Sequence, residues 1–596
     1  MSRFDIRRRD CLAREGSFSH GDLSLRTPGI IDVATVFPDL DREQGTNVPL
    51  SADADFVSLY HRPGKGSPVV VHPLGEEPVA SGDLVVVANW HTALSRPRDF
   101  VRYLAALKER IPPDTAWYAP ASALPSTAAL LVYAGFDLFD YRAADLAAAR
   151  GSLCLPEGMF PAGGAGEGVS VPRGPIPPGR SRQSPEGPQP PGTAPSPSEP
   201  GLPAGPGICG CEGCASGDLR RHNRLALDRE LSLVRRFIAG SRLRELVEAR
   251  CRSDPHQVAI LRLLDGQESL VEPRTPVARS VPLIATSSEA LRRTEVVRFG
   301  GRVMGRSPSP LHDVAVLLPC SARKPYSTSL SHRRFSKAVR GRAHELIVTS
   351  PLGLVPRELE RVYPAAHYDV PVTGHWDREE LALISTVIAG YLARHPYRRV
   401  LAHLEGGALE AAEMAAEACG ISLEVTAAGY PAEPASLAAL DAALDGERRR
   451  PTDMVRGVLA WQFGATVDTR GMTIRGRPPQ ERVERGGKIL FTVDAGTGLL
   501  RPTFDGWALI PDGYRVGIDA FTPKGDILAP GVTSADGGIR EGDEVLVAGE
   551  GVTATGRAAM GGPEMLRSRH GVAVRVRRIM DREGGREGLS PHPSPE

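Results

Sequence analysis

The stretch 317–332, LLPCSARKPYSTSLSH, places several reactive side chains close together. A run of apolar residues ends at Pro319, and a thiol, an amine, a phenol, a hydroxyl and an imidazole follow. These are Cys320, Lys324, Tyr326, Ser329 and His332. A thiolate is a strong nucleophile, and a nearby amine or imidazole can move a proton, so the set could carry out nucleophilic catalysis. Taken singly, Cys320 can also be a small buried side chain, and Tyr326 and Ser329 can serve packing or capping.

The sequence around this thiol is strongly basic. Between Ser321 and His344 there are seven lysines or arginines and no acidic residue. Positive surroundings favour the thiolate and suit an anionic substrate. We expect His332, near the start of a predicted helix, to transfer a proton or bind an anion. We expect Lys324 to orient a phosphate or a carboxylate, and Tyr326 is the alternative to His332 as proton donor.

The elements that must position this stretch form a predicted α/β domain over residues 255–445. The apolar pattern predicts strands at 313–319, 344–350, 368–374, 398–404 and 422–428, and helices at 328–342, 378–394 and 408–419. This alternation indicates a doubly wound sheet, in which ligands bind beyond the carboxyl ends of the strands. We therefore expect further substrate-binding residues near strand ends, namely Pro325, Glu358, Asp377 and Glu405.

A second cluster of chemistry-bearing residues lies in a predicted segment with a helix, residues 208–254. Cys209, Cys211 and Cys214 share one glycine-rich loop, and His222 follows at the start of the helix. Three cysteines and one histidine are a typical closed tetrahedral set for structural zinc. Such close spacing favours a metal over disulfides in the cytoplasm. The alternatives are three thiols brought together by chance and, for His222, an ordinary packed histidine.

The region 1–160 alternates predicted strands and helices, which indicates parallel pairing. At most about four strand–helix units are visible, too few for a complete eight-fold barrel. We predict a degenerate TIM-barrel-like domain here. Residues 161–207 are dominated by proline, glycine and serine. Because this composition cannot bury a core, we predict a disordered insert.

The C-terminal part of the chain is predicted to hold two small domains and a tail. Residues 446–505 read as a small α+β domain, 506–582 as a β-barrel with glycine-rich turns, and 583–596 as a disordered tail. The barrel sequence VAVRVRR alternates apolar and basic residues, so its arginines can face RNA phosphates. The expected RNA-binding residues are Lys524, Arg557, Arg575 and Arg577. The alternative is an edge strand protected by its charge.

Length, composition and charge narrow the class of protein. A chain of 596 residues with 41% hydrophobic and 24% charged residues fits a soluble protein of several domains. The net charge is only +1, so any basic site must be local. The N-terminus lacks the apolar core of a signal peptide, and no run of about 18 apolar residues exists. We therefore expect a cytoplasmic protein without a membrane span.

Three motifs resemble those of one family. The block Pro319-Cys320-x3-Lys324-Pro325-Tyr326-x2-Ser329-x2-His332 matches the signature of the archaeosine synthases, archaeal relatives of the tRNA-guanine transglycosylases. The cysteine cluster with His222 and Asn223 resembles the zinc site of the transglycosylases. Residues 524–547 resemble the core of a PUA domain, an RNA-binding module. The resemblance covers nearly the whole chain, in the order of the family.

The resemblance implies an enzyme that acts on tRNA in which 7-cyano-7-deazaguanine has replaced a guanine of the D-arm. Such enzymes add an amine across the nitrile to form an amidine, with lysine as the implied donor and glutamine as an older assignment. A radical-SAM partner releases the archaeosine base in many lineages. The resemblance also implies structural zinc, a homodimer formed beside the zinc site and an N-terminal barrel that does not exchange bases.

Two alternative functions remain open. The first is an active transglycosylase that exchanges guanine for the deazaguanine base, which requires paired aspartates on a complete barrel. We cannot place such a pair in this sequence. The second is a non-catalytic tRNA-binding protein built on the PUA module, for which the 319–332 block would be dispensable.

Overall fold

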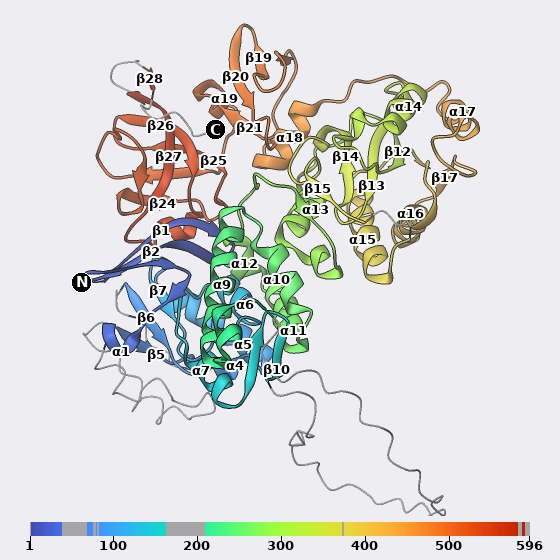
Figure 1. The fold of residues 1–596 in the computed structure, drawn as a ribbon. Coiled ribbons are helices and arrows are strands. Elements are labelled where there is room, and N and C mark those ends of the chain that lie inside the picture. The colour runs from blue at the N-terminus through green and yellow to red at the C-terminus, as the bar shows by residue number, and fades with distance from the viewer. Residues whose placement is uncertain are drawn as a thin grey trace, which may run out of the picture.

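The computed structural model of the chain describes residues 2–37, 68–74, 79, 83–162, 209–371, 375–581 and 587–589. The expected insert beyond residue 162, and most of the expected tail, lie outside these residues. Figure 1 shows an N-terminal unit that carries an α/β domain on one side and a C-terminal β domain on the other. A small orange domain lies between these two. The architecture is therefore multidomain α/β, as the sequence predicts.

The N-terminal unit begins with an antiparallel sheet and continues with a parallel one. The first sheet holds β1 (Ser2–Asp10), β2 (Ala13–His20) and β3 (Leu23–Thr27). The second has the order β4-β8-β7-β6-β5, and all its pairings are parallel. Its elements are β4 (Gly29–Ile30), α1 (Val33–Val36), β5 (Val69–Val71), β6 (Leu84–Val87), α4 (Trp90–Ala93), α5 (Pro97–Arg110), β7 (Ala116–Tyr118), α6 (Ala128–Tyr133), β8 (Leu138–Phe139) and α7 (Arg142–Ala149). Within the described residues this sheet is open, with β4 and β5 as its edges.

A hairpin and a set of helices complete the N-terminal unit. They are β9 (Ser152–Leu155), β10 (Gly158–Pro161), α8 (Glu212–Ser216), α9 (Leu219–Ala239), α10 (Leu243–Cys251), α11 (Pro255–Asp265), α12 (Glu268–Val271) and the 3-10 turn η2 (Glu272–Arg274). Helix α9 buries the stripe Leu227, Leu231, Val234 and Ile238 against this core, because residues three or four apart share one helix face. Helices α11 and α12 join the same core. The second core begins after them, at Val277, and not at residue 255.

The α/β domain is built on the five-stranded sheet β14-β13-β12-β16-β17. Its elements are β11 (Leu283–Ile284), η3 (Ser288–Arg292), α13 (Thr294–Arg306), β12 (Val314–Pro319), η4 (Tyr326–Thr328), α14 (Leu330–Val339), β13 (His344–Thr349), β14 (Gly353–Pro356), η5 (Arg357–Leu359), β15 (Tyr368–Asp369), α15 (Arg378–Arg394), β16 (Arg399–Ala402), α16 (Gly406–Cys419), β17 (Leu423–Val425) and α17 (Pro434–Ala443). Strands β12, β13, β16 and β17 run parallel, and β14 runs antiparallel to β13.

Helices cover both faces of this sheet, because alternate residues of a strand point to opposite sides. Val314, Val316 and Leu318 of β12 pack with α14 and α17. Ala315 and Leu317 pack with α15 and α16. From β12 the chain passes through α14 to β13 on one side, and later through α15 to β16 on the other side. The direction of winding thus reverses at β12, and the carboxyl end of β12 is the switch point of the sheet.

Two elements differ from the sequence prediction. The strand expected at 368–374 is short, and β15 pairs with β11 in a separate two-stranded sheet; residues 372–374 lie outside the described part. Strand β14 is additional, and its four residues are all buried. The pairing of β15 with β11 joins residues far apart in the sequence, whereas β14 pairs with β13 through a tight hairpin. Apolar periodicity encodes neither pairing.

The last two domains consist mainly of antiparallel strands. The small domain has α18 (Met454–Phe463), β18 (Thr473–Arg475), β19 (Arg482–Arg485), β20 (Lys488–Val493), β21 (Leu500–Pro502) and α19 (Phe504–Trp507). The C-terminal domain has β22 (Arg515–Ile518), β23 (Ile527–Leu528), η6 (Ala529–Gly531), β24 (Val532–Ala535), β25 (Glu544–Ala548), β26 (Val552–Ala558), α20 (Gly562–Met565), β27 (Val572–Asp581) and β28 (Glu587–Leu589). Strand β28 pairs with β27, although residues 583–596 are expected to be disordered. Across the described part of the chain, no helix has the length and apolar character needed to span a membrane.

Candidate functional site

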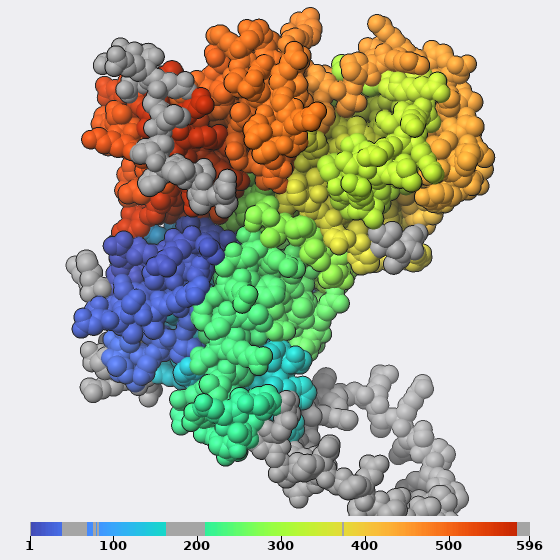
Figure 2. Space-filling model, turned by 45° about the horizontal axis from the view of Figure 1, so that its top comes forward, coloured from blue at the N-terminus to red at the C-terminus, as the bar shows by residue number. Residues whose placement is uncertain are grey.

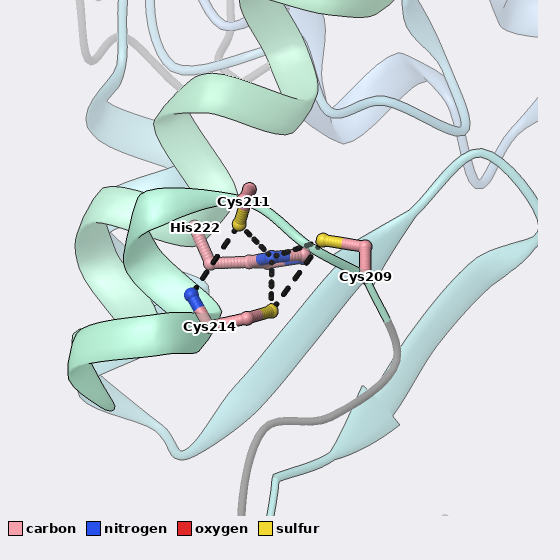
Figure 3. Close-up of side chains that lie close together, drawn as sticks. All are labelled: Cys209, Cys211, Cys214 and His222. Carbon is pink, nitrogen blue, oxygen red and sulfur yellow. Dashed lines mark hydrogen bonds between the residues drawn. The ribbon is translucent and has the colours of Figure 1, made fainter.

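Three thiols and one imidazole converge at the start of α9 (Figure 3). Cys211 caps α8, Cys214 lies within that helix, and His222 lies in the first turns of α9. The Nδ1 atom of His222 is 3.6 Å from Sγ of Cys209, 3.3 Å from Sγ of Cys211 and 3.2 Å from Sγ of Cys214. All four ligand atoms lie within 4.8 Å of one another. The structure therefore brings together the four residues predicted to bind a metal.

The spacing of these atoms fits a tetrahedral metal site. Zinc binds thiolates at about 2.3 Å, which gives tetrahedral edges of about 3.7 Å between ligand atoms. The separation of 3.4 Å between Sγ of Cys209 and Sγ of Cys214 is close to that edge. A closed set of four protein ligands leaves no position for substrate, so such a site is structural. The cluster can hold a metal ion such as zinc.

A second layer of contacts orients the cluster. The Nε2 atom of His222 lies 3.2 Å from the carbonyl oxygen of Cys154, so it can donate a hydrogen bond while Nδ1 faces the thiols. Asn223 accepts a hydrogen bond from the amide of Cys154 at 2.8 Å and donates one to the carbonyl of Ser152 at 2.9 Å. A Cβ atom on Gly213 would lie 2.3 Å from the amide nitrogen of His222, so this close approach requires glycine.

Cys320 directly follows β12 and therefore lies at the switch point of the α/β sheet. It is half-buried and packs against the core of the domain. Lys324 is also half-buried, and its Nζ atom lies 3.8 Å from the centre of the Tyr368 ring. Burial lowers the pKa of Lys324, while Cys320 and Asp369 act in the opposite direction. The thiol and the amine thus share one partly buried loop.

Tyr326 and Ser329 fix the shape of this loop. Tyr326 is fully buried, and its hydroxyl is 2.8 Å from the hydroxyl of Tyr368. The hydroxyl of Tyr368 also lies 2.5 Å from Oγ1 of Thr349. Ser329 caps α14, because its Oγ accepts a hydrogen bond from the amide of His332 at 3.2 Å. Both residues thus fill the packing and capping positions that the sequence left open.

The predicted role of His332 in proton transfer does not fit its surroundings. Its side chain is buried, and Arg357 donates a hydrogen bond to its Nδ1 atom at 2.8 Å. Burial and the charge of Arg357 lower the pKa of His332 to about 3, although an interaction with the backbone of Pro319 raises it. The imidazole is therefore neutral at neutral pH. Because Nδ1 accepts from Arg357, the proton lies on Nε2, which is buried and has no hydrogen-bond partner among the described residues. His332 thus supports the chain next to Cys320.

Arg357 is the residue at this site that sequence reasoning missed. Besides His332, it contacts the carboxylates of Glu345 and Glu360, the latter at 2.7 Å. Glu360 accepts a hydrogen bond from the amide of Ser327 at 2.9 Å. The network therefore connects β13, η5 and the loop that carries Cys320. Residue spacing carries no direct signal for Arg357, because this residue reaches the site only through the antiparallel pairing of β14.

The structure separates the remaining predicted substrate-binding residues. Glu405 is exposed between β16 and α16, at the same sheet edge as Cys320, and Pro325 lies half-buried in the Cys320 loop. Asp377 caps α15 and lines a cavity of about 180 Å³ with Ser350. Glu358 lies at the opposite edge of the sheet, since it bonds to Nε2 of His344, the first residue of β13.

This position of Glu358 corrects the expectation that it joins the pocket of Cys320. Burial acts to raise its pKa, but His344 holds the pKa of Glu358 below its usual value. Glu358 is thus an internal partner of His344. The expectation failed because Glu358 follows β14, which returns antiparallel toward the amino ends of the parallel strands.

Three of the four predicted RNA-binding residues lie together on β26 and β27, and the fourth lies apart from them. Arg557 and Arg575 pair across β26 and β27 and line the same cavity. Arg577, two residues further along β27, forms an ion pair with Glu544. Lys524 is exposed on the loop before β23 and does not line that cavity. Val574 and Val576 are buried, so β27 turns its valines inward.

Comparisons with known proteins agree with this layout. Residues 517–580 match the model of the PUA domain, and residues 296–444 match a domain of unknown function, DUF5591. The second match contains the whole motif from Pro319 to His332. A parallel α/β sheet with a thiol at its switch point, a cluster of metal ligands and a terminal PUA domain together define a multidomain α/β enzyme.

Relatives that match most of the chain show to which family it belongs. The archaeosine synthase subunit alpha of Methanosarcina acetivorans is 40% identical over 528 residues, which are 85% of this chain and 81% of the relative. The archaeosine synthase of Haloferax volcanii is 34% identical over 97% of this chain and 99% of the relative. A tRNA-guanine(15) transglycosylase of Methanothermobacter thermautotrophicus is 28% identical over 60% of this chain and 54% of its own. The chain belongs to the archaeosine synthase family.

Proposed function

We propose that this protein is a tRNA-modifying enzyme of archaeosine biosynthesis. It adds an amine to the nitrile of 7-cyano-7-deazaguanine in the D-arm of tRNA and forms an amidine. The observation that carries the proposal is the presence of Cys320 and Lys324 on one loop at the switch point of the sheet. Family membership and the PUA domain support tRNA as the substrate.

The first chemical step is addition of the Cys320 thiolate to the nitrile carbon. A bond forms between Sγ and carbon, one π bond of the nitrile breaks, and its electron pair moves to nitrogen. The product is a thioimidate once that nitrogen gains a proton. Covalent catalysis of this kind divides one difficult addition into two easier steps.

Lys324 is the proposed source of that proton. Its ammonium group shares the loop with the thiol, and burial lowers the pKa of Lys324 toward the range useful for proton transfer. Tyr326 is less suited, because its hydroxyl is buried against Tyr368. His332 is neutral and bound to Arg357, so it positions the loop.

In the second step the uncharged amine of the donor attacks the thioimidate carbon, and its nitrogen passes one proton back to Lys324. The bond from carbon to Sγ then breaks, and Cys320 leaves as the thiolate that began the cycle. We propose lysine as the donor and keep glutamine as the alternative. The carboxylates of Glu405 and Asp377 lie near the carboxyl edge of the sheet and suit a donor ammonium group.

The Cys3His cluster is proposed to hold zinc as a structural ion. Its four protein ligands would join α8 and the segment before it to the start of α9, and the ion would supply no catalytic chemistry. A homodimer, a radical-SAM partner that completes archaeosine and a cytoplasmic location follow from the same family assignment, and they remain proposals.

One assay separates this function from its rivals. tRNA that carries the cyano base is incubated with labelled lysine, with labelled glutamine in parallel, and unmodified tRNA is incubated with labelled guanine. Label from an amine donor alone supports the synthase, and the donor that labels identifies the amine. Label from guanine alone supports an active transglycosylase. Tight tRNA binding without any label supports a non-catalytic binding protein.

A further inference from the structure

A cavity of about 320 Å³ lies between the first strand of the chain and the PUA domain. One wall is β1, from Phe4 to Arg9, and the other comes from β26 and β27 with the turn before β27. Figure 2 shows the blue surface of the N-terminal residues directly against the red surface of the C-terminal domain. The cavity is separate from the Cys320 loop, which contributes none of its lining.

Contacts across the junction hold the two walls together. Arg9 of β1 donates to Oε1 of Glu564 at 2.8 Å. The amide of Arg569 donates to Oδ2 of Asp114 at 2.7 Å. Arg567 donates to the carbonyl of Glu109 at 2.7 Å. Because these bonds fix the PUA domain on the N-terminal unit, the two walls form one preformed cavity.

The lining of this cavity is strongly positive. Its basic side chains are Arg7, Arg8, Arg9, Arg557, Arg575 and His570. Arg7 and Arg575 are exposed, and no ion pair joins either of them to an acidic side chain of the described ranges. The nearby acids are largely neutralised. Asp5 pairs with Arg3 at 2.9 Å, and Asp114 pairs with Arg569 at 3.4 Å.

The third acidic residue of the lining, Glu541, adds little negative charge. Burial raises the pKa of Glu541 to about 7, although Arg9 and Arg557 act to lower it. A substantial fraction of this carboxyl is therefore protonated at neutral pH. The remaining excess of positive charge in the lining favours an anionic ligand. Guanidinium groups bind phosphate oxygens with two parallel hydrogen bonds.

The size of the cavity limits the ligand. A volume of about 320 Å³ lies at the lower end of the range for small-molecule sites, so it accepts about one nucleotide and no double helix. We propose that this composite cavity binds one nucleotide of the tRNA substrate through its phosphodiester, with Arg7 and Arg575 contacting the phosphate from opposite walls. The proposal rests on tRNA being the substrate and extends recognition from the PUA domain to β1.

Binding of tRNA to four proteins tests the proposal: wild type, Arg7→Ala, Arg575→Ala and the double variant. Each lost phosphate contact should weaken binding about fivefold at 0.15 M salt and reduce the slope of log affinity against log salt by about 0.7. Because both arginines hold one phosphate, the double variant should lose less than the product of the two single effects. Arg98→Ala is the control, since Arg98 is an exposed arginine of α5 that does not line the cavity.

The outcomes separate this proposal from the proposed function. Wild type that neither binds nor modifies tRNA would overturn the function itself. Wild type that binds and modifies tRNA, with Arg7→Ala binding as tightly as Arg98→Ala, overturns the composite cavity alone. Multiplicative effects of the two substitutions would also overturn it. The last experiment titrates the wild type with free GMP. If GMP binds at micromolar concentration, and Arg7→Ala abolishes this binding without weakening tRNA binding, the cavity is a site for a free nucleotide and the proposal is overturned.

Discussion

Arg357 donates a hydrogen bond to the Nδ1 atom of His332, with 2.8 Å between the two nitrogens. The arginine also binds Glu345 and Glu360, and Glu360 binds the amide of Ser327. This connection fixes the protonation state of the histidine and the path of the loop after Cys320. The basic motif therefore contains one imidazole that holds the site together and one lysine that is available for proton transfer.

A first prediction concerns the pH dependence of stability. The pKa of His332 is about 3 in the folded protein, against about 6.5 in the unfolded chain. Between these values the unfolded state binds more protons, so folding stability falls as the pH falls. For His332 the loss between pH 7 and pH 5 is about 2 kcal/mol. Urea unfolding at both pH values should show that His332→Gln loses less unfolding free energy than the wild type. An equal loss in the two proteins would contradict the buried neutral imidazole.

A second prediction concerns the ring of Tyr368 beside Lys324. Tyr368→Phe keeps the ring under the ammonium group and removes only the hydroxyl bonded to Tyr326 and Thr349. Tyr368→Leu removes the ring as well. A cation–π contact of about 1 kcal/mol corresponds to about a fivefold effect on rate. The leucine variant should thus have about fivefold lower amidine formation per folded enzyme than the phenylalanine variant, and equal rates would exclude positioning by the ring.

A third prediction compares two glycines of the metal loop. A Cβ atom on Gly213 would lie 2.3 Å from the amide nitrogen of His222, whereas one on Gly210 meets no atom within 4 Å. Gly213→Ala should therefore displace His222 and lose bound zinc, and Gly210→Ala should keep it. Zinc per chain, measured on the purified proteins by atomic emission, checks this. Full zinc content in Gly213→Ala would mean that His222 is not a ligand.

A fourth prediction concerns Asn223, which holds the strand whose carbonyl faces His222. The side chain of Asn223 bonds to both Cys154 and Ser152. Asn223→Ala should weaken metal retention by about tenfold to a hundredfold, the usual effect of losing an outer contact. Competition with a chromophoric chelator measures the change. Asn223→Asp, which keeps the acceptor for the amide of Cys154, should retain more metal than the alanine variant.

The sequence predicts the elements of the α/β domain well, because they depend on local apolar periodicity. The strand expected at 313–319 is β12, and the helix expected at 378–394 is α15. The four metal ligands are close in sequence, so their convergence is also predictable. Short-range spacing is thus sufficient wherever a site is built from one segment.

Strand direction and the packing of distant segments explain what the sequence could not predict. Strand β14 turns back along β13, and this brings Arg357 to His332 while carrying Glu358 to the far edge of the sheet. Neither contact has a signature in residue spacing. The cavity between β1 and the PUA domain joins residues more than five hundred positions apart, such as Arg7 and Arg575. Such sites become visible only when the domains are placed together.

The most direct test of the central claim, nucleophilic catalysis by Cys320, is the single-turnover rate of amidine formation on tRNA that carries 7-cyano-7-deazaguanine. Serine is a far weaker nucleophile at neutral pH, so Cys320→Ser should lower this rate about a thousandfold or more. Cys419→Ser, which changes a half-buried thiol at the end of α16, should keep the wild-type rate. Full activity of Cys320→Ser would contradict the covalent mechanism.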